Sequence, residues 1–340
     1  MTTALVRALG ALARDTAHAR CGVLCDCRPP AVLADRPDGT VVRCGPVVAK
    51  AHAAGTDTTA LSARLALAAD PGLAGILLAP LPARPPAGPT EHGAASPHLA
   101  ELHGRPVTLW PYGEPVDPGD PDEAPWEEAA ALLARLHRTV SRSDRPAPGD
   151  APGPPPMRGP AKAAVAVARM CAARPGDPAT FPVLAAWRGL PPWARDEAPA
   201  PAHRPHTLCH GDLHLGQLLR HPAPYGPWLL IDVDDAGAGD PSWDLARPAA
   251  WYAAGLLPPD VWSRFLGAYR AAGGPAVRAD GDPWAELDPA ARALTVQTAA
   301  LALAKSAAEH RVPDEVEQVM IDACARIAAL PPELAAEHSS

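Results

Sequence analysis

The first third of the chain alternates short apolar runs with turn-forming residues. Several of these runs are typical of strands, and Asp38-Gly39 between two of them is a strong hairpin signal. A helical pattern with leucines at positions 61, 65 and 67 interrupts the series. Residues 20–110 are therefore expected to form an antiparallel sheet with one helix across it. The predicted strands are residues 23–24, 31–34, 40–43, 47–52, 75–81 and 105–110, and the predicted helix is residues 58–69.

Beyond Trp110 the apolar positions take helical spacing. Residues 126–140 form an amphipathic pattern, and the chain from residue 161 onward is helical apart from a short strand pair around 207–235. Residues 144–160 are rich in proline and glycine, which is typical of an insert or linker.

Length and charge narrow the class of protein. A chain of 340 residues can form two lobes with a sizeable core. We therefore expect an α+β fold with a β-rich lobe at residues 1–110, a mainly helical lobe at residues 111–340, and a cleft between them. The net charge of −8 argues against a nucleic-acid partner, which would require a basic face, and mildly favours a cationic substrate.

The N-terminus and the cysteines indicate a cytoplasmic protein. Arg7, Arg14 and Asp15 interrupt the first apolar stretch, which predicts an amphipathic helix rather than a secretion signal. No apolar run is long enough for a membrane span. The cysteines at 21, 25, 27 and 44 lack a standard zinc spacing, so reduced and packed thiols are the favoured interpretation.

The most informative stretch is residues 208–246, where a polar loop lies between apolar runs and a later buried strand ends in acidic residues. Asp212 and Asp232 are far enough apart for a hairpin to return both carboxylates to one end of a sheet. Phosphoryl transfer needs one carboxylate near the acceptor hydroxyl and another that holds Mg²⁺ against the phosphates. Gln217 adds a side-chain carbonyl oxygen, which is a ligand type that Mg²⁺ accepts.

These residues resemble the signature of the aminoglycoside phosphotransferase family, a branch of the protein-kinase-like fold. That signature is His-Gly-Asp-x-His-x-x-Asn, then an apolar strand with Ile-Asp, then Gly-Asp-Pro-x-x-Asp-Leu-Ala. This chain has His-Gly-Asp-Leu-His-Leu-Gly-Gln at 210–217, Ile-Asp at 231–232 and Gly-Asp-Pro-Ser-Trp-Asp-Leu-Ala at 239–246. The resemblance extends to Leu-Leu-Ala-Arg-Leu-His at 132–137 and to the strands around Lys50.

The resemblance implies a bilobal protein-kinase-like fold and a role for each matched residue. Asp212 would be the catalytic carboxylate that accepts or orients the acceptor proton, and Asp232 would bind the metal. Gln217 stands where the family has asparagine, as in the similar kinases of maltose and related sugars, and keeps a carbonyl ligand on a longer arm. Asp244 would brace the catalytic loop, and His210 would fix it by hydrogen bonds. The implied cofactors are Mg²⁺ and ATP or GTP.

Some of these residues have another interpretation. His210, Asp212 and His214 also have the spacing of a metallohydrolase triplet, although this explains neither Asp232 nor the first lobe. Two further carboxylates, either close to the metal or simply solvated, are Asp234 and Asp235.

Lys50 stands alone among apolar neighbours in a predicted strand of the first lobe. A buried lysine needs a partner, and the α- and β-phosphates of a nucleotide supply one; the alternative is an edge-strand lysine that reaches solvent. Kinases pair this lysine with a helix glutamate, but residues 51–90 contain none. Asp57 is the nearest substitute, unless it caps the following helix. The hairpin at Asp38-Gly39 would cover the phosphates, since no Gly-x-Gly-x-x-Gly is present.

The segment Trp110-Pro111-Tyr112-Gly113 matches the hinge position by the same resemblance. Pro111 has no N–H and cannot donate to a base. The Trp110 carbonyl and the Tyr112 amide are therefore the expected contacts of the nucleotide base.

Together these features predict a small-molecule O-phosphotransferase that uses ATP or GTP and Mg²⁺, with an antibiotic-like or other polyhydroxylated acceptor and no nucleic-acid or membrane partner. A sugar kinase, favoured by Gln217, and a non-catalytic nucleotide-binding regulator, favoured by the missing glutamate, are the alternatives. Acidic residues at 280–288 and 309–317 would favour an amine on the acceptor if they face the cleft, and otherwise coat solvated helices.

Overall fold

The computed structural model describes residues 2–21, 29–36, 38–83, 96–120, 123–139 and 153–330. The chain divides into two units. The first consists of Met1–Ala124 and Gly216–Asp234, and the second of Pro125–Leu215 and Asp235–Ser340. The first unit therefore takes in residues 111–124 and 216–234, which the sequence patterns assigned to the helical lobe.

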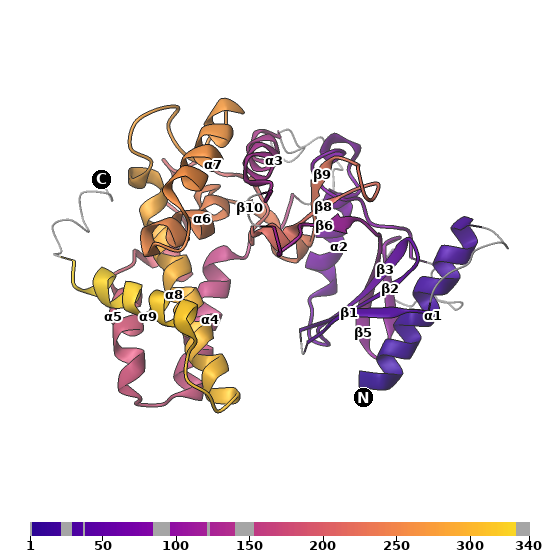
Figure 1. Cartoon of the computed structure of the whole chain (residues 1–340), viewed down its shortest axis with the longest axis horizontal. Helices are drawn as coiled ribbons and strands as arrows, with labels where there is room; N and C mark the ends of the chain where they lie inside the picture. Colours follow the sequence, from indigo (N-terminus) through magenta and orange to yellow (C-terminus); the bar gives the residue numbers. More distant parts are fainter. Residues whose placement is uncertain are drawn as a thin grey trace. The chain divides into compact units, whose positions relative to one another are not determined.

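The first unit is built on a five-stranded antiparallel sheet, as expected for a β-rich lobe (Figure 1). The strand order is β1-β2-β3-β5-β4. The predicted hairpin joins β1 to β2, with Arg36 and Gly39 exchanging backbone hydrogen bonds of 2.9 and 3.2 Å. The strands are β1 (Ala31–Asp35), β2 (Gly39–Cys44), β3 (Val47–His52), β4 (Leu99–Leu102) and β5 (Arg105–Pro111).

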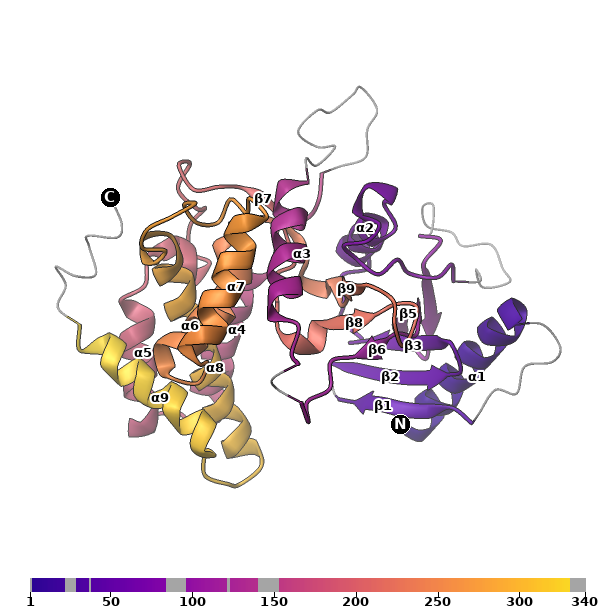
Figure 2. The same cartoon turned by 45° about the horizontal axis from the view of Figure 1, so that its top comes forward.

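Helix α1 (Thr2–Cys21) lies along this sheet (Figure 2). It packs on the sheet through a single apolar stripe. Its buried residues recur every four positions, which places them on one face of a helix. They meet the side chains that β2, β3 and β5 turn toward the same core. The stripe consists of Leu5, Leu9, Ala13 and Ala17, and the sheet contributes Val42, Cys44, Val47, Ala49, Ala51, Val107 and Leu109.

The sequence predictions for the rest of this unit are partly wrong. Helix α2 (Thr58–Ala68) forms as predicted, but residues 75–81 make only isolated bridges at Leu77 and Leu81 instead of a strand. The apolar run is buried there, and burial explains the pattern without a sheet ladder. Strand β4 was not predicted, because its four residues carry a weak signal beside a proline- and glycine-rich stretch.

The segment 216–234 and residues 114–115 together form a small sheet within the first unit. It consists of β6 (Glu114–Pro115), β8 (Leu218–Arg220) and β9 (Trp228–Leu230), paired antiparallel in the order β6-β8-β9. The β8–β9 hairpin is the strand pair that the sequence predicted in this region. Its two ends carry Gln217 and Asp232, and the Ile231 amide donates to the Gln217 carbonyl at 2.9 Å.

The second unit is mainly helical, as predicted. Figure 1 shows α4, α5, α8 and α9 side by side, and many of their contacts are made by small residues such as Ala166, Ala299 and Ala300. Small side chains let helix axes approach closely, so the alanine-rich composition has a packing role here. The helices are α3 (Trp126–Arg138), α4 (Gly159–Ala173), α5 (Phe181–Arg188), α6 (Ser242–Ala254), α7 (Pro259–Ala271), α8 (Trp284–Ala308) and α9 (Glu315–Ala328).

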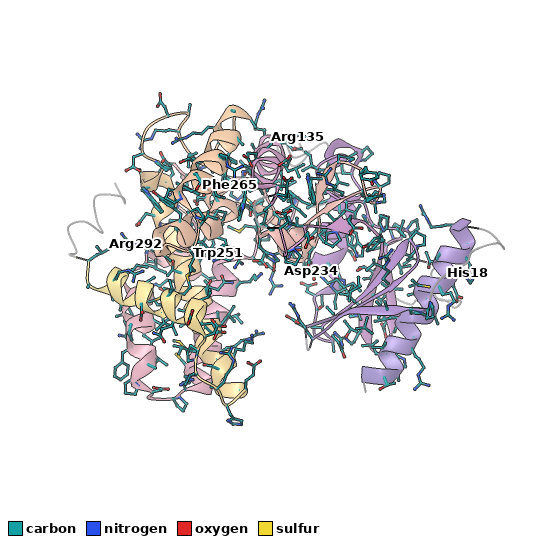
Figure 3. All side chains as sticks on the ribbon, viewed as in Figure 1. His18, Arg135, Asp234, Trp251, Phe265 and Arg292 are labelled. Carbon is teal, nitrogen blue, oxygen red and sulfur yellow. The ribbon has the colours of Figure 1, made fainter. Side chains whose placement is uncertain are left out.

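Two features of this unit frame the loop at 210–215. Strands β7 (Thr207–Cys209) and β10 (Gly237–Gly239) pair antiparallel on either side of it in sequence. Helix α3 packs on α7, where Trp126 meets Phe265 (labelled in Figure 3) edge-to-face with ring centroids 5.9 Å apart. Of the predicted insert at 144–160, residues 144–152 lie outside the described residues, and Gly159 already begins α4.

Two further expectations meet the structure here. No helix among the described residues combines the length and apolarity needed to cross a membrane. Cys25, Cys27 and the predicted strand at 23–24 lie outside the described residues, whereas Cys44 is buried in the core of the first unit.

Candidate active site

The loop that carries Asp212 is anchored by Asp244 of α6 in the second unit. The carboxylate of Asp244 accepts the backbone N–H of His210 at 2.6 Å and that of Gly211 at 2.7 Å. Burial raises the pKa of Asp244, but hydrogen bonds from His137 and the loop outweigh it and hold the pKa below its usual range. Asp244 is therefore ionised and holds the loop through two backbone N–H groups.

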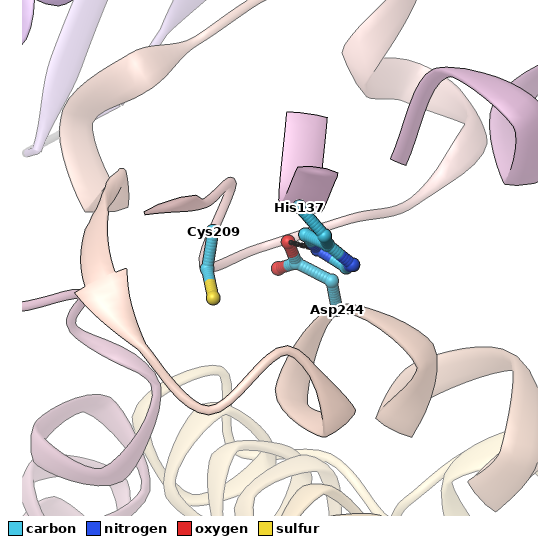
Figure 4. Close-up of side chains that lie close together, drawn as sticks. All are labelled: His137, Cys209 and Asp244. Atoms are coloured by element: carbon cyan, nitrogen blue, oxygen red, sulfur yellow. Dashed lines mark hydrogen bonds and ion pairs between the residues drawn. The ribbon is translucent and has the colours of Figure 1, made fainter. Parts of the chain in front are cut away.

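His137 of α3 and Tyr269 of α7 extend this hydrogen-bond network. His137 Nε2 lies 2.9 Å from Asp244 Oδ2 (Figure 4), and its Nδ1 lies 2.7 Å from the Tyr269 hydroxyl. That hydroxyl also accepts the Ala276 N–H at 3.0 Å. Because the Asp244 carboxylate only accepts, Nε2 of His137 carries a proton and donates it to Asp244.

Cys209 lies beside His137 and Asp244 with all three ligand atoms within 4.8 Å of one another (Figure 4). Burial holds the pKa of the Cys209 thiol well above its usual range, and Sγ lies 3.5 and 3.4 Å from the carbonyls of Thr207 and Gly239. A metal needs the thiolate. We therefore interpret the group as a hydrogen-bonded core. In the described part of the chain, His210, Asp212 and His214 form no such group, so the metallohydrolase alternative has no support.

Asp212 lies between two cations. Lys162 Nζ of α4 is 2.7 Å from Asp212 Oδ2, and an Arg247 nitrogen of α6 is 2.6 Å from Oδ1. Arg247 Nε also donates to the Leu213 carbonyl at 3.0 Å. Burial raises the pKa of Asp212, but the charges of Lys162 and Arg247 outweigh it and lower the pKa to about 2. The carboxylate is therefore ionised at neutral pH.

Gly211 allows Asp235 to approach this loop. Its φ is +85°, and a Cβ at this position would lie 2.3 Å from the Asp235 backbone oxygen. Glycine alone tolerates both conditions. The Asp235 carboxylate reaches Lys162 Nζ at 2.6 Å, so one ammonium group joins Asp212 and Asp235.

In the first unit, Lys50 is held by two carboxylates. Its Nζ lies 2.6 Å from Asp232 Oδ1 and 2.8 Å from Asp234 Oδ2. Burial lowers the pKa of Lys50, but the two negative charges outweigh it and raise the pKa above its usual range. Asp57 accepts the N–H groups of Thr59 and Ala60 as the N-cap of α2. Lys50 thus has two carboxylate partners, whereas Asp57 caps a helix.

His52 connects Asp234 with Trp110. Its ring lies 3.1 Å from Asp234 through Nδ1 and 2.9 Å from the Thr108 hydroxyl through Nε2, and the Trp110 indole donates to that hydroxyl at 2.9 Å. Because the carboxylate only accepts, Nδ1 carries a proton. Asp234, labelled in Figure 3, is thereby fixed by the sheet itself.

The donor set at the ends of the β8–β9 hairpin fits Mg²⁺. Asp232 has φ +61°, a left-handed conformation that turns the chain directly after Ile231. Gln217 is largely buried, and the Ile231–Gln217 backbone bond keeps it next to Asp232. With Asp234, this end presents two carboxylates and an amide carbonyl, which are the hard oxygen ligands that Mg²⁺ prefers.

The expected hinge contacts are only partly available. The Tyr112 amide donates to the Pro46 carbonyl at 2.8 Å, and the Tyr112 carbonyl accepts from His221 Nδ1 at 3.0 Å. The Tyr112 amide is therefore occupied within the first unit and not free for a base, which corrects the expectation. The cause is that the antiparallel pairing of β3 and β5 continues past Pro111.

The comparisons with known proteins place this chain in a family. The model of the phosphotransferase enzyme family, APH, matches residues 78–289, which is more than half of the chain. The chain belongs to this family. It is accordingly a small-molecule phosphotransferase, a kinase that uses a nucleotide and a hydroxyl acceptor, as the motifs predicted. No curated protein matches this phosphotransferase.

Solved structures confirm the fold of the phosphotransferase. The aminoglycoside phosphotransferase APH(4)-Ia, as a thermostable mutant with AMP-PNP and hygromycin B, is 14% identical over 94% of this chain and 99% of its own, with a TM-score of 0.57. Spectinomycin phosphotransferase with ADP and spectinomycin is 12% identical over 100% and 98%, with a TM-score of 0.54. A choline/ethanolamine kinase family protein from Mesorhizobium loti is 16% identical over 100% of both chains, also with a TM-score of 0.54.

Several residues around the phosphotransferase motifs were not predicted from sequence. Lys162 and Arg247 give no signal of their own, because nothing in the sequence indicates that α4 and α6 bring cations to Asp212. His137 belongs to the helix at 132–137 that resembles the family, but the sequence predicted no role for it in the site. His52 follows Lys50 by two positions and therefore lies on the same face of β3, a relation that the sequence could have revealed.

Proposed function

We propose that this phosphotransferase transfers the γ-phosphoryl group of ATP or GTP to a hydroxyl of a polyhydroxylated, antibiotic-like small molecule, with Mg²⁺ as cofactor. The observation that carries the proposal is the state of Asp212, an ionised carboxylate on a loop whose amides are tied to Asp244. Such a group can orient an acceptor hydroxyl and take up its proton as the new bond forms.

In this proposal the first unit binds the nucleotide. Lys50 pairs with the α- and β-phosphates, and the Trp110 carbonyl contacts the base. Asp232 and Gln217 would hold Mg²⁺, which when bound neutralises phosphate charge. His210 and Asp244 keep the loop in place. The missing helix glutamate was the argument for a non-catalytic regulator. Because Lys50 has two carboxylate partners without that glutamate, this argument loses its force.

A sugar kinase is the second candidate, and Gln217 favours it. The acidic residues near the C-terminus do not support an amine-bearing acceptor, because most of them are held by arginine side chains or by backbone N–H groups. Among the described residues, Glu286 pairs with Arg278, Asp288 with Arg292, and Glu309 and Glu317 with Arg311, while Asp282 and Asp314 accept backbone N–H groups.

The test is a transfer assay with ATP and with GTP against a panel of aminocyclitols, macrolides, nucleosides, maltose and other sugars. Phosphorylated product is detected by mass spectrometry, and basal nucleotide hydrolysis serves as the first step. A phosphorylated product with one acceptor class identifies the substrate class, and a product with maltose alone supports the sugar-kinase hypothesis. Nucleotide binding without turnover on any acceptor would contradict the proposed activity.

A further inference from the structure

The contacts of Lys162 set it apart from the other cation on Asp212. Arg247 is tied to the loop, because its guanidinium bonds both the Asp212 carboxylate and the Leu213 carbonyl. Lys162 makes no backbone contact through its ammonium group among the described residues and bridges two carboxylates instead, Asp212 and Asp235. Arg247 thus positions the loop, whereas Lys162 offers a charge on a flexible stem.

The ammonium group of Lys162 has capacity to bind another anion. Two carboxylates accept hydrogen bonds from two of its three N–H groups, and its side chain is 24% exposed. The charges of Asp235 and Asp212 keep its pKa above the usual range although burial lowers it. Lys162 is therefore a protonated, reachable cation directly beside the carboxylate that the proposed function places at the acceptor hydroxyl.

Phosphoryl transfer builds its charge at this position. In its loose transition state, negative charge spreads over the equatorial oxygens of the phosphoryl group, and catalysis comes mainly from positioning and electrostatic stabilisation. A group hydrogen-bonded to the acceptor hydroxyl is close to the phosphorus that this hydroxyl attacks. Because Lys162 Nζ lies 2.7 Å from Asp212, a change in the Lys162 side-chain conformation would bring it to a phosphoryl oxygen.

We propose that Lys162 is a catalytic residue that contacts an equatorial oxygen of the phosphoryl group during transfer; this rests on the proposed function. The acceptor oxygen forms a bond to the γ-phosphorus, and the bond from phosphorus to the β–γ bridging oxygen breaks with its electron pair leaving on the nucleoside diphosphate. The acceptor proton passes to Asp212 and then to water. Lys162 keeps its protons throughout and exchanges one carboxylate for the phosphoryl oxygen.

Three variants on one helix test this proposal. Lys162→Met removes the cation, and Arg169→Met, an exposed position of the same helix that makes none of the ion pairs found in the described part of the chain, is the matched control. We expect Lys162→Met to lower kcat about 10²–10³-fold, with both KM values changed less than about 3-fold. Lys162→Arg should restore part of kcat. A kcat for Lys162→Met within about 3-fold of wild type would overturn the proposal.

A binding measurement separates contact with the phosphoryl group from an effect on Asp212 alone. Calorimetry compares ADP with Mg²⁺ against ADP with Mg²⁺ and aluminium fluoride, which imitates the phosphoryl group in transfer. Aluminium fluoride should tighten ADP binding to the wild type and to Arg169→Met but not to Lys162→Met. ADP without aluminium fluoride should bind all three proteins equally. Equal tightening in Lys162→Met, or none in the wild type, contradicts the proposal. The acceptor panel judges the proposed function independently, since these titrations need no acceptor.

Discussion

His137 and Asp244 are 107 residues apart in sequence and share a fully buried hydrogen bond of 2.9 Å. Through this bond, helix α3 fixes the same carboxylate that holds the amides of His210 and Gly211. The conformation of the loop is therefore set by a helix that precedes it by some seventy residues. A substitution at His137 should therefore alter the loop that carries Asp212, although His137 itself does not contact Asp212 among the described residues.

We expect His137→Leu to destabilise the protein by about 3 kcal/mol, because it leaves a buried carboxylate without one of its donors. His137→Gln can place an N–H donor near the former Nε2 and should cost less. Chemical unfolding followed by circular dichroism measures both. Equal stabilities for the two variants would show that shape, and not the donor, is what His137 supplies.

Replacement of the proposed catalytic carboxylate tests the site most directly. Asp212→Asn should lower kcat by about 10²–10⁴-fold, since an amide cannot take up the acceptor proton. The dissociation constant of the nucleotide should change little, because Asp212 belongs to the second unit and the proposed phosphate ligands to the first. A variant that keeps more than half of the wild-type kcat at saturating acceptor would remove Asp212 from the mechanism.

The metal ligands can be ranked by their charge. Asp232→Asn replaces a charged ligand by a neutral one and should abolish most activity and raise the Mg²⁺ concentration needed for half-maximal rate. Gln217→Asn keeps a carbonyl on a shorter arm and should retain part of the activity. Magnesium titrations of the two variants and the wild type give the comparison. An unchanged Mg²⁺ dependence for Asp232→Asn would exclude that residue from the metal site.

Asp57 and Asp234 are the two candidates for the role of the missing helix glutamate, which in kinases pairs with the lysine. Asp57→Ala should cost about 1 kcal/mol of stability through the lost N-cap and leave nucleotide affinity unchanged. Asp234→Asn removes a charged partner of Lys50 and should weaken nucleotide binding. Thermal unfolding and nucleotide titration of both variants assign the roles. Weaker nucleotide binding in Asp57→Ala would reverse the assignment.

The pKa of Asp212 gives a prediction for stability against pH. Its folded pKa, about 2, is below the ordinary value. The carboxylate therefore stabilises the fold above the unfolded pKa, and the contribution of about 2 kcal/mol is lost as the pH falls toward 2. The difference in unfolding free energy between wild type and Asp212→Asn should shrink from pH 5 to pH 2.5. A difference that is constant over this range would show that Lys162 and Arg247 do not stabilise the charge.

The sequence by itself determined the local elements and the motif residues. Short apolar runs bounded by turn residues predicted β2, β3 and β5, and helical spacing predicted α1, α2 and α3, because each pattern reflects how the element is buried. The order and spacing of the motifs at 210–246 were sufficient to identify the family. The failures, β4 and the expected strand at 75–81, are short segments in which burial and pairing leave the same apolar signature.

Only the tertiary structure decided which side chains meet. Lys162, Arg247, His137 and His52 act on partners between 35 and 182 residues away. No local pattern encodes such a contact, because a charge on a helix looks the same in the sequence whether it faces solvent or Asp212. Ion pairs and hydrogen bonds depend on distances of a few ångströms in space, and the fold alone sets those distances.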